Sequence, residues 1–475
     1  MIEPATSLPV AVIGAGPVGL AAAAQLVERG LTPLVFERGD GAGAAMRDWA
    51  HVRVFSPWCF NIDDAARRLL ERHGWTAPDT DALPTGGEIV SLYLEPLAAL
   101  PELAGAMRFG AEVIAITRDG LDKMTSQRRD ALPFAIRWRD GAGELHVTKV
   151  RAVIDASGTW KRPNPIGIDG LEVSGEAEHA GRIAYGMPDV LGAARADYAG
   201  KRVLIIGGGH SAIQSALGLL ELQRQAPETH ISWGLRRNRI ERLLGGGLND
   251  QLPARGELGL AARRAIEEER LDLLAPFAVQ AIDSAGDGLA VTATLNGHEI
   301  NLEVDRIIVA TGFRPDLDML RELRVSLDPA VEAPPALAPL IDPNLHSCGT
   351  VPPHGIEELS HPEKDFVIVG AKSYGRAPTF LMATGYEQVR SVAAELAGDH
   401  AAARQVQLVL PETGVCSTGN LVAADAAEGC CGGPAKSEES CCVADETAKA
   451  EGADGCGCGS TAAPAEVTVR VPAEA

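Results

Sequence analysis

The sequence predicts an α/β fold with two Rossmann-like, three-layer domains. Residues 10–37 read as a β-branched strand, a glycine turn, a helix of small apolar residues and a second strand, and residues 201–237 repeat that order. Short apolar strands then alternate with helical patterns as far as about residue 405, which is typical of βαβ units. From residue 411 onward Ala, Gly, Glu, Ser and Cys dominate, so we expect a disordered, Cys-rich C-terminal tail.

The turn after the first strand has the G-x-G-x-x-G spacing of a phosphate-binding loop. Gly14 permits the tight turn, Gly16 lets a pyrophosphate approach the backbone, and Gly19 lets helix and strand pack closely. The phosphates would lie at the helix N-terminus, whose N–H groups and dipole favour anions. Glu37 ends the second strand at about the distance expected for the acid that binds a ribose hydroxyl. Strand, helix and terminal acid agree, so this unit predicts a dinucleotide site.

The second unit has the same spacing with alanine in the third place, as Gly207, Gly209 and Ala212. His210 and Ser211 open the helix that follows, so we expect both to contact a second pyrophosphate. The alternatives are an ordinary loop residue for His210 and a plain helix N-cap for Ser211. Two glycine fingerprints in one chain therefore predict two nucleotide sites.

Two basic residues, Arg236 and Arg237, follow the strand 230–235, at the position where the first unit has an acid. Guanidinium groups suit a 2′-phosphate, so the second nucleotide is expected to be NADPH and not NADH. The alternative for this pair is a solvated basic patch.

Two further apolar strands are each followed by a short glycine-containing motif. D-A-S-G begins at Asp155 and A-T-G-F-R-P-D begins at Ala310, each directly after an apolar strand. Both resemble the chain crossings of flavoproteins with two dinucleotide-binding domains, and the resemblance covers about residues 8–400. It implies FAD in the first domain and an NADPH domain inserted into a split FAD domain. The expected parts are 8–165 and 311–405 for the FAD domain, 166–310 for the NADPH domain, and 406–475 for the tail.

Within that family the pattern is similar to flavin-containing and Baeyer–Villiger-type monooxygenases. Their linker signature is F-x-G-x-x-x-H-x-x-x followed by an aromatic residue. Gly175 and His179 match it, whereas Val173 and Ile183 do not. His179 is more simply a linker residue than a catalytic base. W-A-H-V-R-V-F-S-P-W (49–58), Y-G-M-P-D-V (185–190) and K-S-Y-G-R-A-P-T-F (372–380) further resemble flavoproteins encoded beside arsenic-resistance genes.

The residues expected to bind the two cofactors come from these loops and strand ends. They are Gly14, Ala15, Gly16, Pro17, Gly19, Glu37, Arg38, Val113, Ala156 and Gly158 for FAD, and Gly207, Gly209, His210, Ser211, Arg236 and Arg237 for NADPH. The catalytic residues are unknown. Trp58, Asn61 and Asp63 are candidates that would border the flavin ring, and the alternative is a packed aromatic turn.

The cysteines divide into two groups. Cys59 and Cys348 are isolated, no C-x-x-C dithiol follows a strand in the folded part, and Cys59 is most simply a small buried residue. The tail contains cysteine pairs, which we expect to bind a soft metal or metalloid. They are Cys430, Cys431, Cys441, Cys442, Cys456 and Cys458. The C-C-G-G-P at Cys430 resembles cysteine tails of arsenic-operon proteins. The same pairs would serve as a redox dithiol if the enzyme were a reductase.

The formal net charge of −21 argues against nucleic acid or an anionic membrane as a partner. The N-terminus lacks a basic n-region and no apolar run is long enough to span a bilayer, so we expect a cytoplasmic protein. The sequence does not decide between a monomer and a homodimer.

The favoured function is an FAD- and NADPH-dependent monooxygenase that uses O₂ to oxygenate a small nucleophile such as an arsenical or a thiol. The alternatives are a thiol or disulfide reductase and a non-enzymatic metalloid-binding protein.

Overall fold

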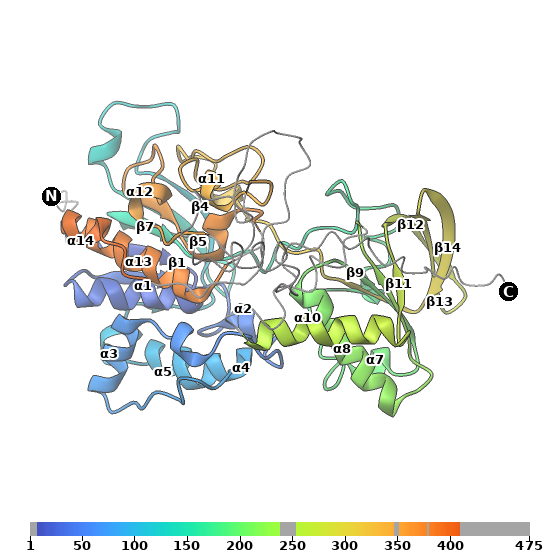
Figure 1. The fold of residues 1–475 in the computed structure, drawn as a ribbon. Helices are drawn as coiled ribbons and strands as arrows, with labels where there is room; N and C mark the ends of the chain where they lie inside the picture. Colours follow the sequence, from blue (N-terminus) through green and yellow to red (C-terminus); the bar gives the residue numbers. More distant parts are fainter. Residues whose placement is uncertain (1–6, 238–252, 346–350, 378–379, 409–475) are drawn as a thin grey trace, which may run out of the picture.

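The computed structural model of the chain describes residues 7–237, 253–345, 351–377 and 380–408. Two five-stranded parallel sheets organise these residues, and Figure 1 shows the elements of the first at the left and those of the second at the right. The six metal or metalloid cysteines predicted in the tail lie outside the described residues. Among the helices that are described, none has the length and hydropathy needed to cross a bilayer.

The first sheet has the strand order β16-β7-β1-β2-β3, and all its pairs are parallel. Its strands are β1 (Val10–Ile13), β2 (Pro33–Phe36), β3 (Met107–Arg108), β7 (Ala152–Asp155) and β16 (Phe366–Ile368). The strand β1 reads V-A-V-I and is buried along its whole length. A continuous apolar run of this kind is typical of a parallel strand that is covered on both faces.

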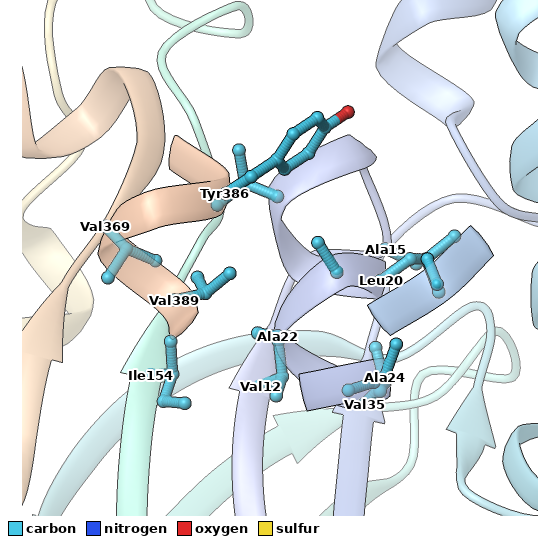
Figure 2. Packing of buried hydrophobic residues seen from close by; sticks show 14 of the residues in the cluster. Val12, Ala15, Leu20, Ala22, Ala24, Val35, Ile154, Val369, Tyr386 and Val389 are labelled. Carbon is cyan, nitrogen blue, oxygen red and sulfur yellow. The ribbon is translucent and has the colours of Figure 1, made fainter. Parts of the chain in front are cut away.

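The two faces of the first sheet are covered differently. Val10 and Val12 pack with α1 (Pro17–Glu28) and α13 (Met382–Leu396), and Figure 2 shows Val12, Ala22 and Val389 meeting in this core. Ala11 and Ile13 face an antiparallel sheet instead, made of β4 (Glu112–Arg118), β5 (Phe134–Arg139) and β6 (Leu145–Val150). The alternation follows from the period of two along a strand, and it gives a three-layer unit.

The second sheet repeats this plan. Its parallel strand order is β11-β10-β9-β15-β8. The strands are β8 (Ile183–Tyr185), β9 (Arg202–Ile206), β10 (His230–Gly234), β11 (Asp272–Leu274) and β15 (Arg306–Val309). One face carries α8 (His210–Gln225) and α10 (Pro253–Glu267), and the other carries the antiparallel sheet β12 (Phe277–Ala285), β13 (Gly288–Leu295) and β14 (His298–Val304). The predicted α/β fold class with two three-layer domains is therefore confirmed.

Short helices complete both halves. In the first they are α2 (Ala44–Arg47), α3 (Asp64–Arg72), α4 (Gly86–Ile89), α5 (Glu95–Ala98), α6 (Pro101–Ala104), α11 (Ala338–Ile341), α12 (Ile356–Leu359) and α14 (His400–Arg404), with α7 (Arg195–Tyr198) in the second. Single turns of 3₁₀ or π helix lie at Trp58–Phe60, Val90–Leu94, Arg129–Ala131, Ala180–Arg182, Asp318–Leu320 and Gly370–Tyr374.

The chain passes between the two sheets twice, because the second sheet lies in sequence between β7 and β16. The two connecting segments run side by side. Asn164 N donates to Gly312 O and Arg314 N donates to Arg162 O, each at 2.9 Å. Asn164 Nδ2 also donates to Thr311 O at 3.1 Å, and Thr311 Oγ1 donates to Asn164 O at 2.9 Å. The halves are thus joined by a paired, antiparallel connection. The exact boundaries 8–165, 166–310 and 311–405 stay a prediction.

Candidate functional site: two glycine loops at the carboxyl ends of the parallel strands

In the first glycine loop, Gly14 and Gly19 have no room for a side chain, whereas Gly16 between them does. Gly14 has φ +100°, and a Cβ there would lie 2.7 Å from the carbonyl oxygen of Ala156. A Cβ at Gly19 would lie 2.0 Å from the carbonyl oxygen of Gly14. At Gly16, by contrast, a Cβ would meet nothing within 4 Å. The first and third glycines are required by the protein itself, and the second borders empty space where a phosphate can approach the backbone.

The helix that follows this loop begins without a side-chain cap. Gly16 is the N-cap of α1 with no side-chain hydrogen bond, and Pro17 occupies the first turn. The first-turn N–H groups of a helix have no partner inside the helix, and together with the dipole they form an anion site. The loop and α1 therefore fit the pyrophosphate of a dinucleotide.

Glu37 is half-buried just past the end of β2, and its carboxylate lies beside the loop. It accepts hydrogen bonds from Ala15 N at 2.8 Å and from Gly39 N at 2.7 Å. Ala111 N donates to Glu37 O at 2.8 Å, which brings the start of β4, with Val113, next to this acid. Arg38 is exposed, with its guanidinium 4.0 Å from a carboxylate oxygen of Glu112. The structure thus gathers Ala15, Glu37, Arg38 and the strand of Val113 at one end of the first sheet.

A buried ion pair lies at the same end of the sheet, under the first chain crossing. Lys372 Nζ is 2.7 Å from Asp155 Oδ2 and 3.0 Å from Ser157 Oγ, and both charged side chains are fully buried. It ties the turn after β16 to the D-A-S-G segment, whose Ala156 carbonyl closes over Gly14. Gly158 ends that segment with φ +68°. No sequence pattern indicated that Lys372 pairs with Asp155.

The second glycine loop has the same geometry as the first. Gly207 has φ +138°, and a Cβ there would lie 2.3 Å from the carbonyl oxygen of Ala310, in the second chain crossing. A Cβ at Gly209 would meet nothing within 4 Å. Gly209 is the N-cap of α8, without a side-chain hydrogen bond, so His210 and Ser211 lie in the first turn. The alternative of Ser211 as the N-cap is wrong, because the chain enters the helix two residues earlier.

Arg236 and Arg237 lie just past the end of β10, and both side chains are exposed. The neighbouring Leu235 is buried and fixed between strands: its N–H donates to Leu274 O, and its carbonyl accepts from Phe277 N, each at 2.8 Å. The two guanidinium groups therefore project from a rigid strand end beside the second loop. In the strand register Gly234 corresponds to Phe36, so Leu235 is the equivalent of Glu37, and the two arginines follow it by one and two residues.

The three flavin-ring candidates have structural partners in the first half. Trp58 is buried in the core with α1. Asn61 donates to the carbonyls of Ser56 at 2.7 Å and Pro57 at 2.9 Å, which closes the turn. Asp63 caps α3 by accepting from Ala66 N at 2.9 Å. These contacts are those of a packed aromatic turn, and a position of the three beside a flavin ring stays a prediction.

Asp63 is also a strongly perturbed acid. Its carboxylate accepts from Gln25 Nε2 at 3.0 Å, and its N–H donates to Tyr93 Oη at 3.1 Å. Burial raises its pKa to about 6, because the two hydrogen bonds to the carboxylate compensate only part of the desolvation.

Aromatic side chains gather where the two connecting segments leave the first half. Trp160 follows the first crossing and Phe313 the second, with ring centroids 4.6 Å apart, and Trp49 lies 6.2 Å from Trp160. Trp160 Nε1 donates to Asp48 Oδ2 at 2.9 Å. A Cβ at Gly186 would lie 2.9 Å from the Trp160 ring, so that glycine makes room for it. These rings come from three distant parts of the sequence, and no local pattern predicted that they would meet.

The linker glycine of the monooxygenase-like signature has a packing role. Gly175 has φ +80°, and a Cβ there would lie 1.8 Å from the carbonyl oxygen of Ile282 on β12. His179 N donates to Gly175 O at 3.1 Å. Gly175 is therefore explained by the way the linker lies on the second half, whereas the cited bond of His179 is a backbone bond that any residue could make.

Among the described residues, Cys59 is the only cysteine. It is exposed, so the expectation of a buried residue is wrong. Partial burial and the neighbouring Asp81 carboxylate raise the pKa of its thiol. A raised pKa lowers the thiolate fraction on which nucleophilic attack depends. Among the described residues, Asp140, Glu144 and His146 come close enough together to share a metal ion, and they lie on the partly exposed hairpin between β5 and β6.

The fold and the two loops define a protein with two dinucleotide-binding domains. A family model described as pyridine nucleotide-disulphide oxidoreductase matches residues 8–349, and the chain belongs to this family. A ferredoxin–NADP reductase of Thermus thermophilus is 28% identical over 207 residues, 42% of this chain and 53% of that protein. An indole-3-pyruvate monooxygenase of Oryza sativa is 31% identical over 210 residues, 44% of each chain. The chain thus spans about half the length of these relatives.

Solved structures show the same fold at low identity. Bacillithiol disulfide reductase from Bacillus cereus superposes with a TM-score of 0.62 at 18% identity, over 82% of this chain and 99% of that one. A cadaverine monooxygenase from Erwinia amylovora, solved with FAD, gives a TM-score of 0.57 at 12% identity, over 85% and 99%. The predictions of an oxidoreductase and of FAD and a nicotinamide nucleotide as cofactors are confirmed at the level of the family. The reaction and the substrate are matters for proposal.

Proposed function

We propose that the protein is an FAD- and NADPH-dependent monooxygenase that oxygenates a small nucleophile, an arsenical or a thiol. The observation that supports two cofactors is the repeated loop geometry. Each parallel sheet ends at a glycine whose Cβ would meet nothing within 4 Å, at the start of a helix without a side-chain cap. Two such sites in one chain suit two dinucleotides.

The residues around each loop assign the two nucleotides. Glu37 holds a carboxylate where a ribose with free hydroxyls would bind, so the first loop would take FAD. Arg236 and Arg237 present two exposed guanidinium groups one and two residues past the equivalent place in the second half, where a 2′-phosphate would bind, so the second loop would take NADPH. Bound FAD would supply the redox chemistry, by accepting a hydride from NADPH and activating O₂. One oxygen atom would go to the lone pair of arsenic or sulfur and the other would leave as water.

The described cysteine favours a monooxygenase over a dithiol reductase. Cys59 is exposed, without a second cysteine among the described residues, and the pKa of its thiol is raised. Thiol–disulfide exchange needs a thiolate and, in a dithiol enzyme, a partner thiol. Among the described residues Cys59 has no partner thiol, and its raised pKa lowers the fraction of thiolate.

A thiol or disulfide reductase is the second candidate, because the fold is shared with a bacillithiol disulfide reductase. In that case the cysteine pairs of the tail would supply the dithiol. A third candidate is a metalloid-binding protein in which the tail sequesters soft ions. The arsenical substrate rests on the sequence motifs at 49–58, 185–190 and 372–380 and on the tail cysteines.

Turnover with and without oxygen separates the first two candidates. A monooxygenase oxidises NADPH continuously only when O₂ is present, so anaerobic NADPH oxidation stops after one flavin equivalent. A reductase continues without oxygen when a disulfide is supplied. Sustained anaerobic turnover with a low-molecular-weight disulfide would exclude the monooxygenase as the main activity.

A further inference from the structure

A short segment of the first half, residues 52–55, lies against the start of α8 in the second half. The segment is fixed to its own half by the loop before α4. Arg53 and Thr85 form an antiparallel bridge, Val54 N donates to Pro84 O at 2.9 Å, and Gly86 N donates to Val52 O at 2.9 Å. The segment is therefore a rigid projection of the first half.

Two contacts connect this segment with α8. The ring centroid of Phe55 is 5.2 Å from that of His210, with the rings tilted by 46°. Gln214 Nε2 donates to the carbonyl oxygen of Arg53 at 3.1 Å. His210 and Gln214 are one helical turn apart, so both contacts fall on the same face of the first two turns of α8.

The contact leaves the phosphate position of the second loop open. A Cβ on Gly209, directly before His210, would meet no atom within 4 Å even with Phe55 in place. The segment is thus a side wall of the second nucleotide site and does not plug it. A ring that packs on His210 restricts the rotation of that imidazole, and the bond to Gln214 holds the helix end that carries the first-turn N–H groups.

We propose that Phe55 and the Arg53 carbonyl are positioning groups for the nicotinamide nucleotide, contributed by the FAD-binding half to the NADPH site. They act through His210 and Gln214, and they hold the first turn of α8 in the orientation that receives the pyrophosphate. The affinity of the second site would then depend on a residue about 155 positions earlier in the chain, in the other half. The inference rests on the proposed assignment of NADPH to the second loop.

The test is NADPH binding to the FAD-loaded full-length protein. Phe55→Ala should weaken NADPH by roughly 3- to 10-fold, the range expected for loss of one aromatic contact, and should slow the anaerobic reduction of FAD at subsaturating NADPH. Phe55→Tyr keeps the ring and should restore both. Gln214→Ala should weaken NADPH in the same direction. Gln225→Ala is the matched control, because it makes the same change at the exposed far end of α8, beside Arg195.

A double-variant cycle distinguishes positioning from a general loss of structure. If Phe55 acts through His210, then Phe55→Ala should add little to the loss caused by His210→Ala, while FAD content and Tm stay at the wild-type values. Wild-type NADPH affinity in both Phe55→Ala and Gln214→Ala would overturn the inference, as would a loss of FAD or of Tm in Phe55→Ala that Phe55→Tyr does not rescue. A wild-type protein that binds no NADPH would instead refute the proposed function.

Discussion

Substitution of the open glycine separates ligand binding from folding. Gly16 has φ −78° and ψ −175°, which any residue adopts, and a Cβ there would meet nothing within 4 Å. Gly16→Val should therefore change the free energy of unfolding of the FAD-free protein by less than about 1 kcal/mol. The same side chain fills the space in which the pyrophosphate approaches α1. If two hydrogen bonds to phosphate are lost, at about 1.5–3 kcal/mol each, Kd for FAD rises by roughly 10²- to 10⁴-fold.

The second loop and the first glycine provide the controls. Gly209→Val makes the same change in the second half and should weaken NADPH while leaving FAD bound. Gly14→Ala differs, because φ of +100° and the Ala156 carbonyl at 2.7 Å strain the fold itself, so Tm should fall without any ligand. Thermal unfolding of the FAD-free proteins and FAD titration by fluorescence measure these quantities. A Gly16→Val protein that binds FAD within threefold of wild type would refute the assignment of the loop.

Three more predictions follow from the charges and the tail. Replacing Arg236 and Arg237 with Ala should weaken NADPH by roughly 2–4 kcal/mol and NADH much less; equal losses in titrations with both nucleotides would show that the arginines do not bind the phosphate. Asp63 has a raised pKa of about 6 in the folded state, so the stability it contributes is complete below the pKa of about 4 of the unfolded chain and is lost as the pH rises through 6. In urea unfolding, Asp63→Asn should therefore gain up to about 3 kcal/mol relative to wild type between pH 4 and pH 7, and an unchanged difference would contradict the burial argument. Truncation after residue 410 should leave FAD content and NADPH oxidation intact and remove tight arsenite binding, whereas equal arsenite binding by the truncated protein would exclude a metalloid role for the tail.

The sequence predicted the two glycine loops because their spacing encodes their geometry. Gly14 and Gly207 must have positive φ, and each must pass close to a carbonyl of the chain crossing that follows the neighbouring strand; only glycine allows both. The continuous apolar run of β1 likewise indicated a strand buried on both faces. What is local in the chain, such as strand, turn and helix start, could therefore be predicted.

Contacts between distant segments could not be predicted in this way. The pair of Lys372 with Asp155 and the stack of Trp160 on Phe313 join residues that no period or motif relates. The aromatic and polar residues around Trp58 suggested a position beside the flavin ring. In the structure, Asn61 closes a turn and Asp63 caps α3. The sequence shows that aromatic and polar residues lie near one another along the chain. The direction in which each side chain points depends on the tertiary structure.

The origin of the oxygen atom in the product tests the proposed function most directly. The full-length protein, with FAD and NADPH, would be mixed with a trivalent arsenical or a thiol under ¹⁸O₂ in ordinary water, and the product examined by mass spectrometry. Exchange of the product oxygen with water would be measured in a parallel sample of authentic product. The monooxygenase proposal predicts one ¹⁸O atom per product molecule and one NADPH consumed per O₂. A product without the label would contradict the proposal. So would NADPH consumption in which all of the oxygen is released as hydrogen peroxide, with the arsenical and with the thiol.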